Sequence, residues 1–332
     1  MSNAKQILSM LHSRAEGDED RFLAIALQVA AGEARQGHRS NAEEIRAAVE
    51  ALRGERAGAR SVRVALAEPR GNLAGLLTLR EPAVRLGDVV LSAGLRTRLD
   101  VVLVQQRRRA ILREHGRVPT RRLLFAGPPG SGKTMTAEAL AGELKLPLMV
   151  VRLEALITRF MGETASQLRL VFDETIRRRA VYLFDEFDAV GGHRRATNDV
   201  AEMRRVLNSF LQFMEEPTTT DSLLVAATNH PDLLDGALQR RFDEVVLFEM
   251  PTTDQVKAVV QAHLVPMKAP RIAWKKVADA ATGLSQAEIG RAAEEAVKAA
   301  ILSEREKVAT DDLLQELAAR QAMRGVFNME IG

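Results

Sequence analysis

Residues 127–134 read Gly127-Pro128-Pro129-Gly130-Ser131-Gly132-Lys133-Thr134. This octapeptide fits the pattern GxxxxGK[ST], follows the apolar run Leu123–Ala126 and precedes the helical pattern Met135–Leu144. Glycines let the backbone N–H groups of such a loop turn inward around phosphates, and the positive end of the following helix adds to the attraction. Lys133 supplies a charge for the β- and γ-phosphates, and the Thr134 hydroxyl can ligate Mg²⁺. The stretch therefore predicts a site for ATP and Mg²⁺.

Five apolar, strand-like runs surround this loop. Each of the first four is followed by a helical pattern, and this alternation is typical of a parallel sheet covered by helices. We therefore expect an α/β fold of the P-loop NTPase type over residues 86–252 and a small all-helical lid over residues 253–332. The runs are Leu123–Ala126, Leu148–Leu153, Val181–Phe184, Leu223–Ala227 and Val245–Phe248.

Two further parts are expected before this core. Residues 1–52 carry apolar positions at helical spacing and predict a small helical N-terminal domain. Residues 53–85 are punctuated by Gly and Pro and rich in Arg, so we interpret them mainly as a basic linker. The apolar runs Val62–Leu66 and Leu73–Leu79 within them also fit strands or partner-docking segments.

Composition narrows the functional classes. The 332 residues include no Cys, which excludes disulfides, thiolate metal sites and a Cys nucleophile. The net charge is only +3, so nucleic acid is not expected as a partner, and the Arg-rich residues 107–122 are interpreted mainly as a solvated helix with intersubunit contacts. No charge-free apolar run approaches the roughly 20 residues that cross a bilayer, and the first residues do not resemble a secretory signal. We expect a cytoplasmic protein without a membrane partner.

Polar residues follow two of the other apolar runs. Asp185 and Glu186 come directly after Val181–Phe184, at the end of a strand where ligands bind in such sheets. Asp185 would orient Mg²⁺ through its water shell and Glu186 would polarise the attacking water; the alternative is a helix N-cap. Asn229 follows the run Leu223–Ala227, where its amide can hold that water or serve a turn.

Four motifs in order resemble the AAA family of the AAA+ ATPases. They are GPPGSGKT (127–134), LFDEFDAVGG (183–192), VAATNHP (225–231) and LDGALQRRFDEV (234–245), and the resemblance covers roughly residues 86–320. It implies Walker A and Walker B roles for the phosphate loop and the carboxylate pair, a sensor role for Asn229, and arginine fingers that act in trans at Arg240 and Arg241. The adjacent arginines follow the katanin-like pattern. The implied nucleotide contacts are Asp88, Val89, Gly127, Pro128, Pro129, Gly130, Ser131, Gly132, Lys133, Thr134 and Met135.

The lid motif Gly283–Ile289 departs from the family pattern. Gln286 stands where the family has Gly, and Ala287 stands where other branches carry a sensor-2 Arg. Arg291, one turn further on, is a weak substitute for that arginine.

A second stretch resembles the first pore loop of AAA unfoldases. Residues Ile157–Glu163 present the basic Arg159, the aromatic Phe160 and the apolar Met161 before Gly-Glu. In such rings the aromatic residue grips an extended protein chain, whereas the alternative places Phe160 in the core after the strand.

The resemblance implies ATP hydrolysis in a homo-oligomeric ring, expected to be a hexamer, that unfolds, threads or disassembles a protein client. Residues 1–85 would choose the client. The alternative is a nucleotide-switched regulator or scaffold of a separately encoded effector such as a protease, and a DNA-linked loader or motor ranks third.

Overall fold

The computed structural model describes residues 29, 30, 43, 69, 71–156, 161–187, 197–218, 220–230, 239–265, 267 and 271–329. By its contacts the chain divides into two units, Met1–Leu66 and Ala67–Gly332. The three described residues of the first unit are helical. The rest of the predicted N-terminal domain lies outside the described residues.

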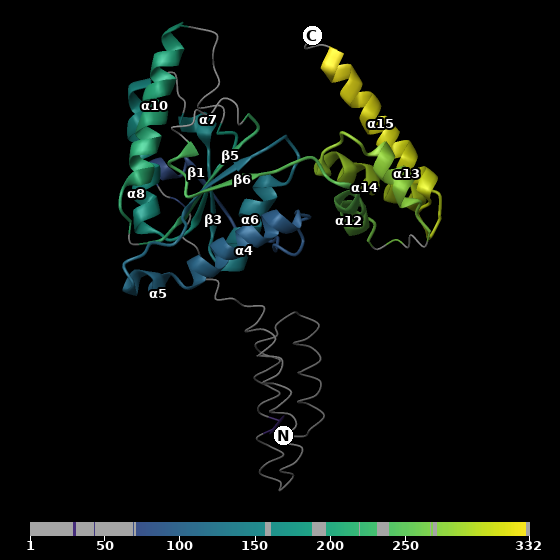
Figure 1. Ribbon diagram of the computed structural model, residues 1–332, viewed down its shortest axis with the longest axis horizontal. Helices are drawn as coiled ribbons and strands as arrows, with labels where there is room; N and C mark the ends of the chain where they lie inside the picture. Colours follow the sequence, from purple (N-terminus) through teal and green to yellow (C-terminus); the bar gives the residue numbers. More distant parts are fainter. Residues whose placement is uncertain are drawn as a thin grey trace. The chain divides into compact units, whose positions relative to one another are not determined.

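A six-stranded sheet forms the centre of the second unit, in the order β1-β3-β4-β5-β2-β6 (Figure 1). All neighbouring strands from β3 to β6 run parallel, which confirms the predicted fold class. The parallel strands are β2 (Arg122–Ala126), β3 (Leu148–Val151), β4 (Val181–Phe184), β5 (Leu223–Thr228) and β6 (Glu244–Leu247).

The antiparallel edge strand β1 (Leu77–Arg80) corrects the interpretation of residues 53–85 as mainly a linker. Leu77 lies opposite Val151 and Arg80 opposite Leu148 in β3. Leu76 and Leu77 are buried, so this run contributes to the core. The alternative that gave Leu73–Leu79 a strand was closer. β1 escaped the pattern because it lies in a stretch punctuated by Gly and Pro and no helix follows it directly.

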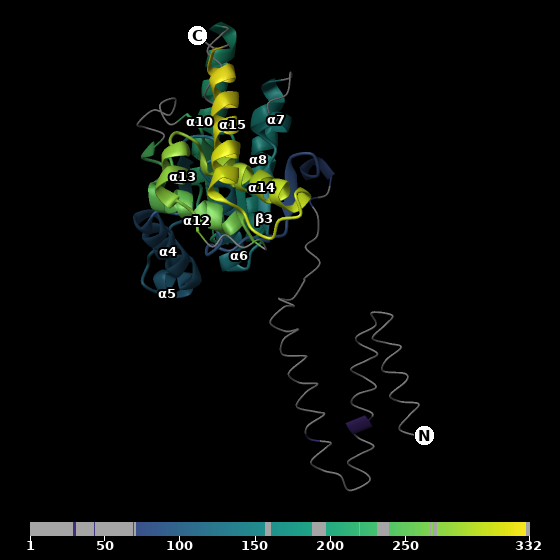
Figure 2. The same ribbon diagram turned by 90° about the vertical axis from the view of Figure 1, so that its right-hand side faces the viewer.

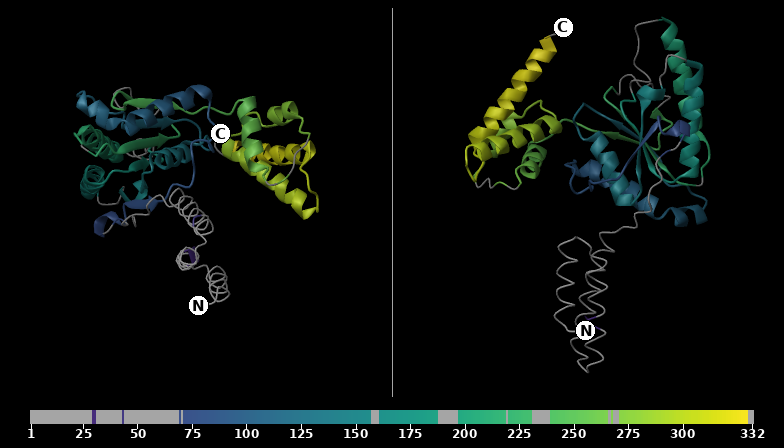
Figure 3. Two further views of the ribbon diagram at one scale, coloured as in Figure 1. Left: turned by 90° about the horizontal axis from the view of Figure 1, so that it is seen from below. Right: turned by 180° about the vertical axis from the view of Figure 1, so that it is seen from behind.

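Helices cover both faces of the sheet (Figure 3). Alternate residues of each strand point to opposite faces, so Leu124 packs towards α8 (Met161–Arg177) and α10 (Thr197–Glu215), whereas Leu123 and Phe125 pack towards α4 (Ala93–Arg107) and α6 (Lys133–Leu144). Shorter helices are η1 (Gly71–Leu73), α5 (Arg109–Glu114) and α7 (Leu153–Leu156). Strands buried on both faces read as continuous apolar runs, which is why the sequence revealed them.

The elements that follow β6 are helices that share a third core (Figure 2). Capping boxes start two of them, at Thr252 with Gln255 and at Ser285 with Glu288. They are α12 (Thr253–His263), α13 (Trp274–Ala280), α14 (Gln286–Leu302) and α15 (Thr310–Met329). Within the described ranges, no helix combines the length and the apolar character needed to cross a bilayer.

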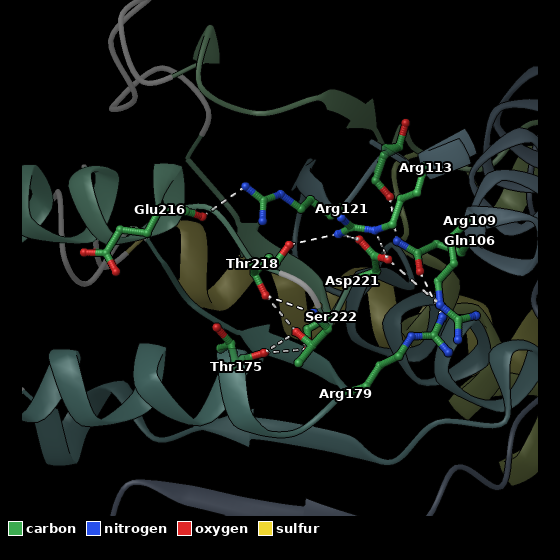
Figure 4. Close-up of polar contacts among 12 residues, drawn as sticks. Gln106, Arg109, Arg113, Arg121, Thr175, Arg179, Glu216, Thr218, Asp221 and Ser222 are labelled. Carbon is green, nitrogen blue, oxygen red and sulfur yellow. Dashed lines mark hydrogen bonds and ion pairs between the residues drawn. The ribbon is translucent and has the colours of Figure 1, made fainter. Parts of the chain in front are cut away.

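Asp221 ties α5 to the start of β5 (Figure 4). Its side chain is 3% exposed and accepts two hydrogen bonds from Arg113, at 2.9 Å from Nε and 2.6 Å from Nη2. This pairing raises the pKa of Arg113. Asp221 also has φ of 53°, in the left-handed region that Asp and Asn tolerate better than most other residues with a side chain.

An Asp221→Asn substitution is expected to lower the free energy of unfolding by about 2 kcal/mol, because it keeps the backbone conformation and removes the charge that two hydrogen bonds from Arg113 satisfy. The matched control is Asp100→Asn, whose ion pair with Arg96 is exposed and should contribute less than about 1 kcal/mol. Urea unfolding followed by circular dichroism measures both. Equal losses in the two variants would contradict the role given to Asp221.

Candidate ATP site

The phosphate loop joins the end of β2 to the start of α6. Gly127 has φ of 153° and lies so close to Phe248, the residue after β6, that an added Cβ would clash with the Phe248 carbonyl oxygen. Gly132 has φ of 96°, directly before the first residue of α6, Lys133. Glycine is therefore required at these two positions, for close approach at the first and for the left-handed turn at the second.

Lys133 and Asn229 meet inside this loop. The Lys133 ammonium donates hydrogen bonds to the carbonyls of Gly127 and Pro128, at 2.7 and 2.8 Å. It also donates to Asn229 Oδ1 at 2.9 Å. The predicted phosphate-binding charge and the predicted water-holding amide thus lie within direct hydrogen-bonding distance, at the carboxyl ends of β2 and β5.

The carboxylate pair lies beside them, at the end of the fully buried strand β4. The Thr134 hydroxyl donates to Asp185 Oδ2 at 2.7 Å, and Asp185 Oδ1 accepts from the backbone N–H of Glu186 at 3.0 Å. Glu186 has φ of 52°, a left-handed conformation that is costly for a residue with a side chain and is concentrated at functional sites. Its side chain is exposed to the pocket, as a group that acts on a ligand must be.

A pocket of about 490 Å³ brings these groups together. Of the predicted nucleotide contacts, Gly127, Pro128, Val89 and Ser131 are not among its lining residues; Val89 is buried, and the neighbouring Val90 lines the pocket in its place. The predicted residues that line it are Asp88, Pro129, Gly130, Gly132, Lys133, Thr134, Met135, Asp185, Glu186 and Asn229.

The helices after β6 close one side of the pocket with residues that sequence reasoning missed. Val259, Ala262 and His263 of α12 line it, and the His263 ring is held by Glu294 of α14 at 2.9 Å from Nδ1. These residues carry no motif, and an apolar stripe on an amphipathic helix gives the same pattern whether it faces a core or a ligand.

Gln286, which stands where the family has Gly, makes a hydrogen bond that Gly could not make. Gln286 Nε2 donates to the Val90 carbonyl at 3.0 Å, and the Ala287 N–H donates to the Gly130 carbonyl at 3.0 Å. The start of α14 is therefore bonded to both the segment around Asp88 and the phosphate loop. Arg291 is exposed and does not line the pocket.

The predicted arginine fingers lie away from the pocket of their own chain. Arg240 is exposed, and Arg241 forms an ion pair with Glu215 at the end of α10, at 2.5 Å. Among the described residues, no arginine lines the pocket. The predicted pore-loop residues Arg159 and Phe160 lie outside the described residues, and Met161 begins α8.

The donor set suits magnesium. The Thr134 hydroxyl and the Asp185 carboxylate offer adjacent oxygen atoms, the ligand type that Mg²⁺ prefers, and Mg²⁺ takes its other ligands from water and nucleotide phosphates. No cluster of three or more His, Cys, Asp or Glu side chains suited to a metal occurs in the described parts of the chain.

A Lys133→Ala substitution is expected to weaken ATP binding at least about tenfold, because it removes a charge-assisted contact with the phosphates. Isothermal titration calorimetry with ATP and Mg²⁺ measures the loss. The matched control is Lys298→Ala in α14, an exposed lysine outside the pocket, which should bind ATP as the unaltered chain does. An unchanged dissociation constant for Lys133→Ala would contradict this placement of the phosphates.

Several known proteins are similar to this chain in sequence. Residues 123–250 match the family described as ATPase family associated with various cellular activities (AAA). The uncharacterized AAA family ATPase y4kL of Sinorhizobium fredii is 35% identical over 312 residues, which cover 92% of this chain and 93% of that protein. The ATP-dependent zinc metalloprotease FtsH of Acidothermus cellulolyticus is 32% identical over 245 residues, and the match spans 71% of this chain but only 37% of that protein.

A solved structure agrees with the fold. The FIGL-1 AAA domain superposes with a TM-score of 0.61 over 82% of this chain and 99% of that domain, at 19% sequence identity. The match to y4kL extends over nearly the whole chain, well beyond the residues of the family model. This chain is therefore an ATPase of the AAA family.

Proposed function

We propose that this ATPase works as a homo-oligomeric ring, expected to be a hexamer, in which a neighbouring subunit completes each ATP pocket. The observation that carries the proposal is the composition of the pocket. It brings together a lysine, a threonine, two carboxylates and an amide, the groups to which we assign ATP binding and hydrolysis, yet no arginine of the described residues lines it. A guanidinium that stabilises charge on the transferred phosphoryl group would then come from Arg240 or Arg241 of the next copy.

Within each pocket the proposed roles follow from geometry. Mg²⁺ held at Thr134 and Asp185 would neutralise negative charge on the phosphates. Glu186 would accept the proton of the attacking water, and Asn229, anchored by Lys133, would orient that water. The backbone N–H groups of residues 130–134 and the start of α6 would cradle the phosphates, with the ATP base between Asp88–Val90 and α12.

We further propose that hydrolysis drives the unfolding, threading or disassembly of a protein client. The support is the sequence Ile157–Glu163, with Phe160 and Met161 as sequence-tolerant apolar contacts for a polypeptide, together with the similarity to FtsH, whose name describes an ATP-dependent protease. Residues 1–85, with the predicted helical domain 1–52, would select the client.

A Phe160→Ala substitution tests the threading step. Proteins held by a Glu186→Gln variant in ATP are identified first, and their remodelling is then measured with the otherwise unaltered chain. Phe160→Ala should abolish remodelling while most of the basal ATP hydrolysis remains. Leu302→Ala is the control, since this lid residue is 85% exposed and apolar. Full remodelling by Phe160→Ala would exclude threading through this loop and favour a nucleotide-switched regulator.

A further inference from the structure

A second polar cluster lies at the end of the sheet opposite the ATP pocket. Asp221 precedes β5, Arg179 precedes β4, and Arg109 begins α5 (Figure 4). The ATP pocket, by contrast, is built after β2, β4 and β5 and contains none of these residues. The cluster therefore has no part in ATP hydrolysis as derived above.

Both carboxylate oxygens of Asp221 already accept hydrogen bonds from an arginine. Asp221 accepts both hydrogen bonds from Arg113, and Arg109 approaches it with Nε at 3.9 Å. Since Asp221 is almost fully buried, a third guanidinium has little access to it. Arg109, Arg113 and Arg179 thus share the single negative charge of Asp221, and these four side chains together carry a net charge of +2.

Arg179 is the least satisfied of the three. Its Nη2 donates to the neutral amide oxygen of Gln106 at 3.1 Å, and its buried Nε has no hydrogen-bond partner among the described residues. No carboxylate of the described residues lies within ion-pair distance of it. The Arg109 and Arg179 guanidinium groups lie side by side as like charges (Figure 4). Burial lowers the pKa of Arg179, the positive charge of Arg109 lowers it further, and the negative charge of Asp221 offsets only part of this.

We propose that Arg109 and Arg179 form a binding site for a phosphate dianion, either free or carried as a phosphoryl group on a partner peptide. A guanidinium presents paired N–H donors that match phosphate oxygens, and the doubly charged anion balances the surplus of two positive charges, whereas a single carboxylate would balance half of it. The side chain of Arg109 is 39% exposed, so the site opens to solvent. Gln106, buried and bonded to the Thr120 carbonyl, holds Arg179 in place.

The test uses the full chain with its ATP pocket filled by ADP and Mg²⁺. Inorganic phosphate is titrated by calorimetry at constant ionic strength, and a phosphoserine peptide is compared with its unphosphorylated form. Arg109→Gln and Arg179→Gln should each weaken phosphate binding at least about tenfold. Arg108→Gln, which removes the same charge from an exposed neighbour, should leave it unchanged. Arg179→Lys should bind phosphate with intermediate affinity, because lysine keeps the positive charge but lacks the paired N–H donors of the guanidinium.

Binding of either phosphate source with this arginine dependence supports the site, and the tighter of the two identifies the source. The absence of binding to both would overturn it, as would equal affinities for the unaltered chain, Arg109→Gln and Arg179→Gln. An equal loss in Arg108→Gln would indicate a diffuse basic surface of the kind that nucleic acid uses, and would also overturn it. If Arg179→Gln does not fold, the Arg109→Gln variant decides, because this side chain is only partly buried, and its basal ATP hydrolysis is the check on folding.

Discussion

A Glu186→Gln variant is expected to bind ATP as tightly as the unaltered chain and to hydrolyse it about 10²- to 10⁴-fold more slowly. The amide has the shape of the carboxylate but cannot accept a proton from water. The substitution leaves the left-handed backbone at Glu186 in place, and the contacts of Thr134 and Lys133 are untouched. Substitution of Glu186 should therefore change the rate of ATP hydrolysis without changing the affinity for ATP.

Calorimetry gives the ATP affinity of Glu186→Gln, and phosphate release in a single turnover gives the rate. Glu81→Gln is the matched control, because Glu81 is an exposed glutamate of the same unit outside the pocket. A Glu186→Gln rate within a few-fold of the control would remove Glu186 from its proposed role.

The double substitution Arg240→Ala with Arg241→Ala is expected to slow hydrolysis about 10³-fold or more, the effect of losing an arginine that stabilises the transferred phosphoryl group. ATP affinity should fall far less, since neither residue lines the pocket of its own chain. The single variants will show which arginine acts. Arg240 is exposed, whereas Arg241 must exchange its ion pair with Glu215 for the phosphate.

The control for the arginine pair is Arg271→Ala, which removes one exposed positive charge away from the pocket. Its hydrolysis rate should match that of the unaltered chain. Hydrolysis that survives in both single variants and in the double variant would show that the pocket needs no guanidinium from this segment.

The parallel strands and the polar residues at their carboxyl ends could be predicted from the sequence, because both produce local sequence patterns. Strands buried on two faces are continuous apolar runs, and the phosphate loop needs glycines at fixed positions such as Gly127 and Gly132. The carboxylates and the amide were expected together because carboxyl ends of parallel strands share one edge, and Lys133 indeed meets Asn229 there.

The pocket and cluster residues that could not be predicted from the sequence are those whose positions depend on tertiary packing. Asp88 and Val90 line the pocket whereas Val89 is buried, and these residues lie at a turn and bend whose side-chain directions follow no sequence period. His263 lies on a helix whose face towards the pocket resembles a core stripe. Arg109, Arg179 and Asp221 are far apart in sequence, so only the fold reveals their shared charge imbalance.

The proposed ring requires an arginine from one subunit to complete the ATP pocket of the next. The most direct measurement mixes the Glu186→Gln variant, which has intact arginines and an inactive pocket, with the Arg240→Ala, Arg241→Ala variant, which has an intact pocket and no arginines. With ATP and Mg²⁺, the mixture should release phosphate well above the sum of the two separate rates. A mixture that merely equals that sum, while the unaltered chain hydrolyses ATP under the same conditions, would contradict this requirement.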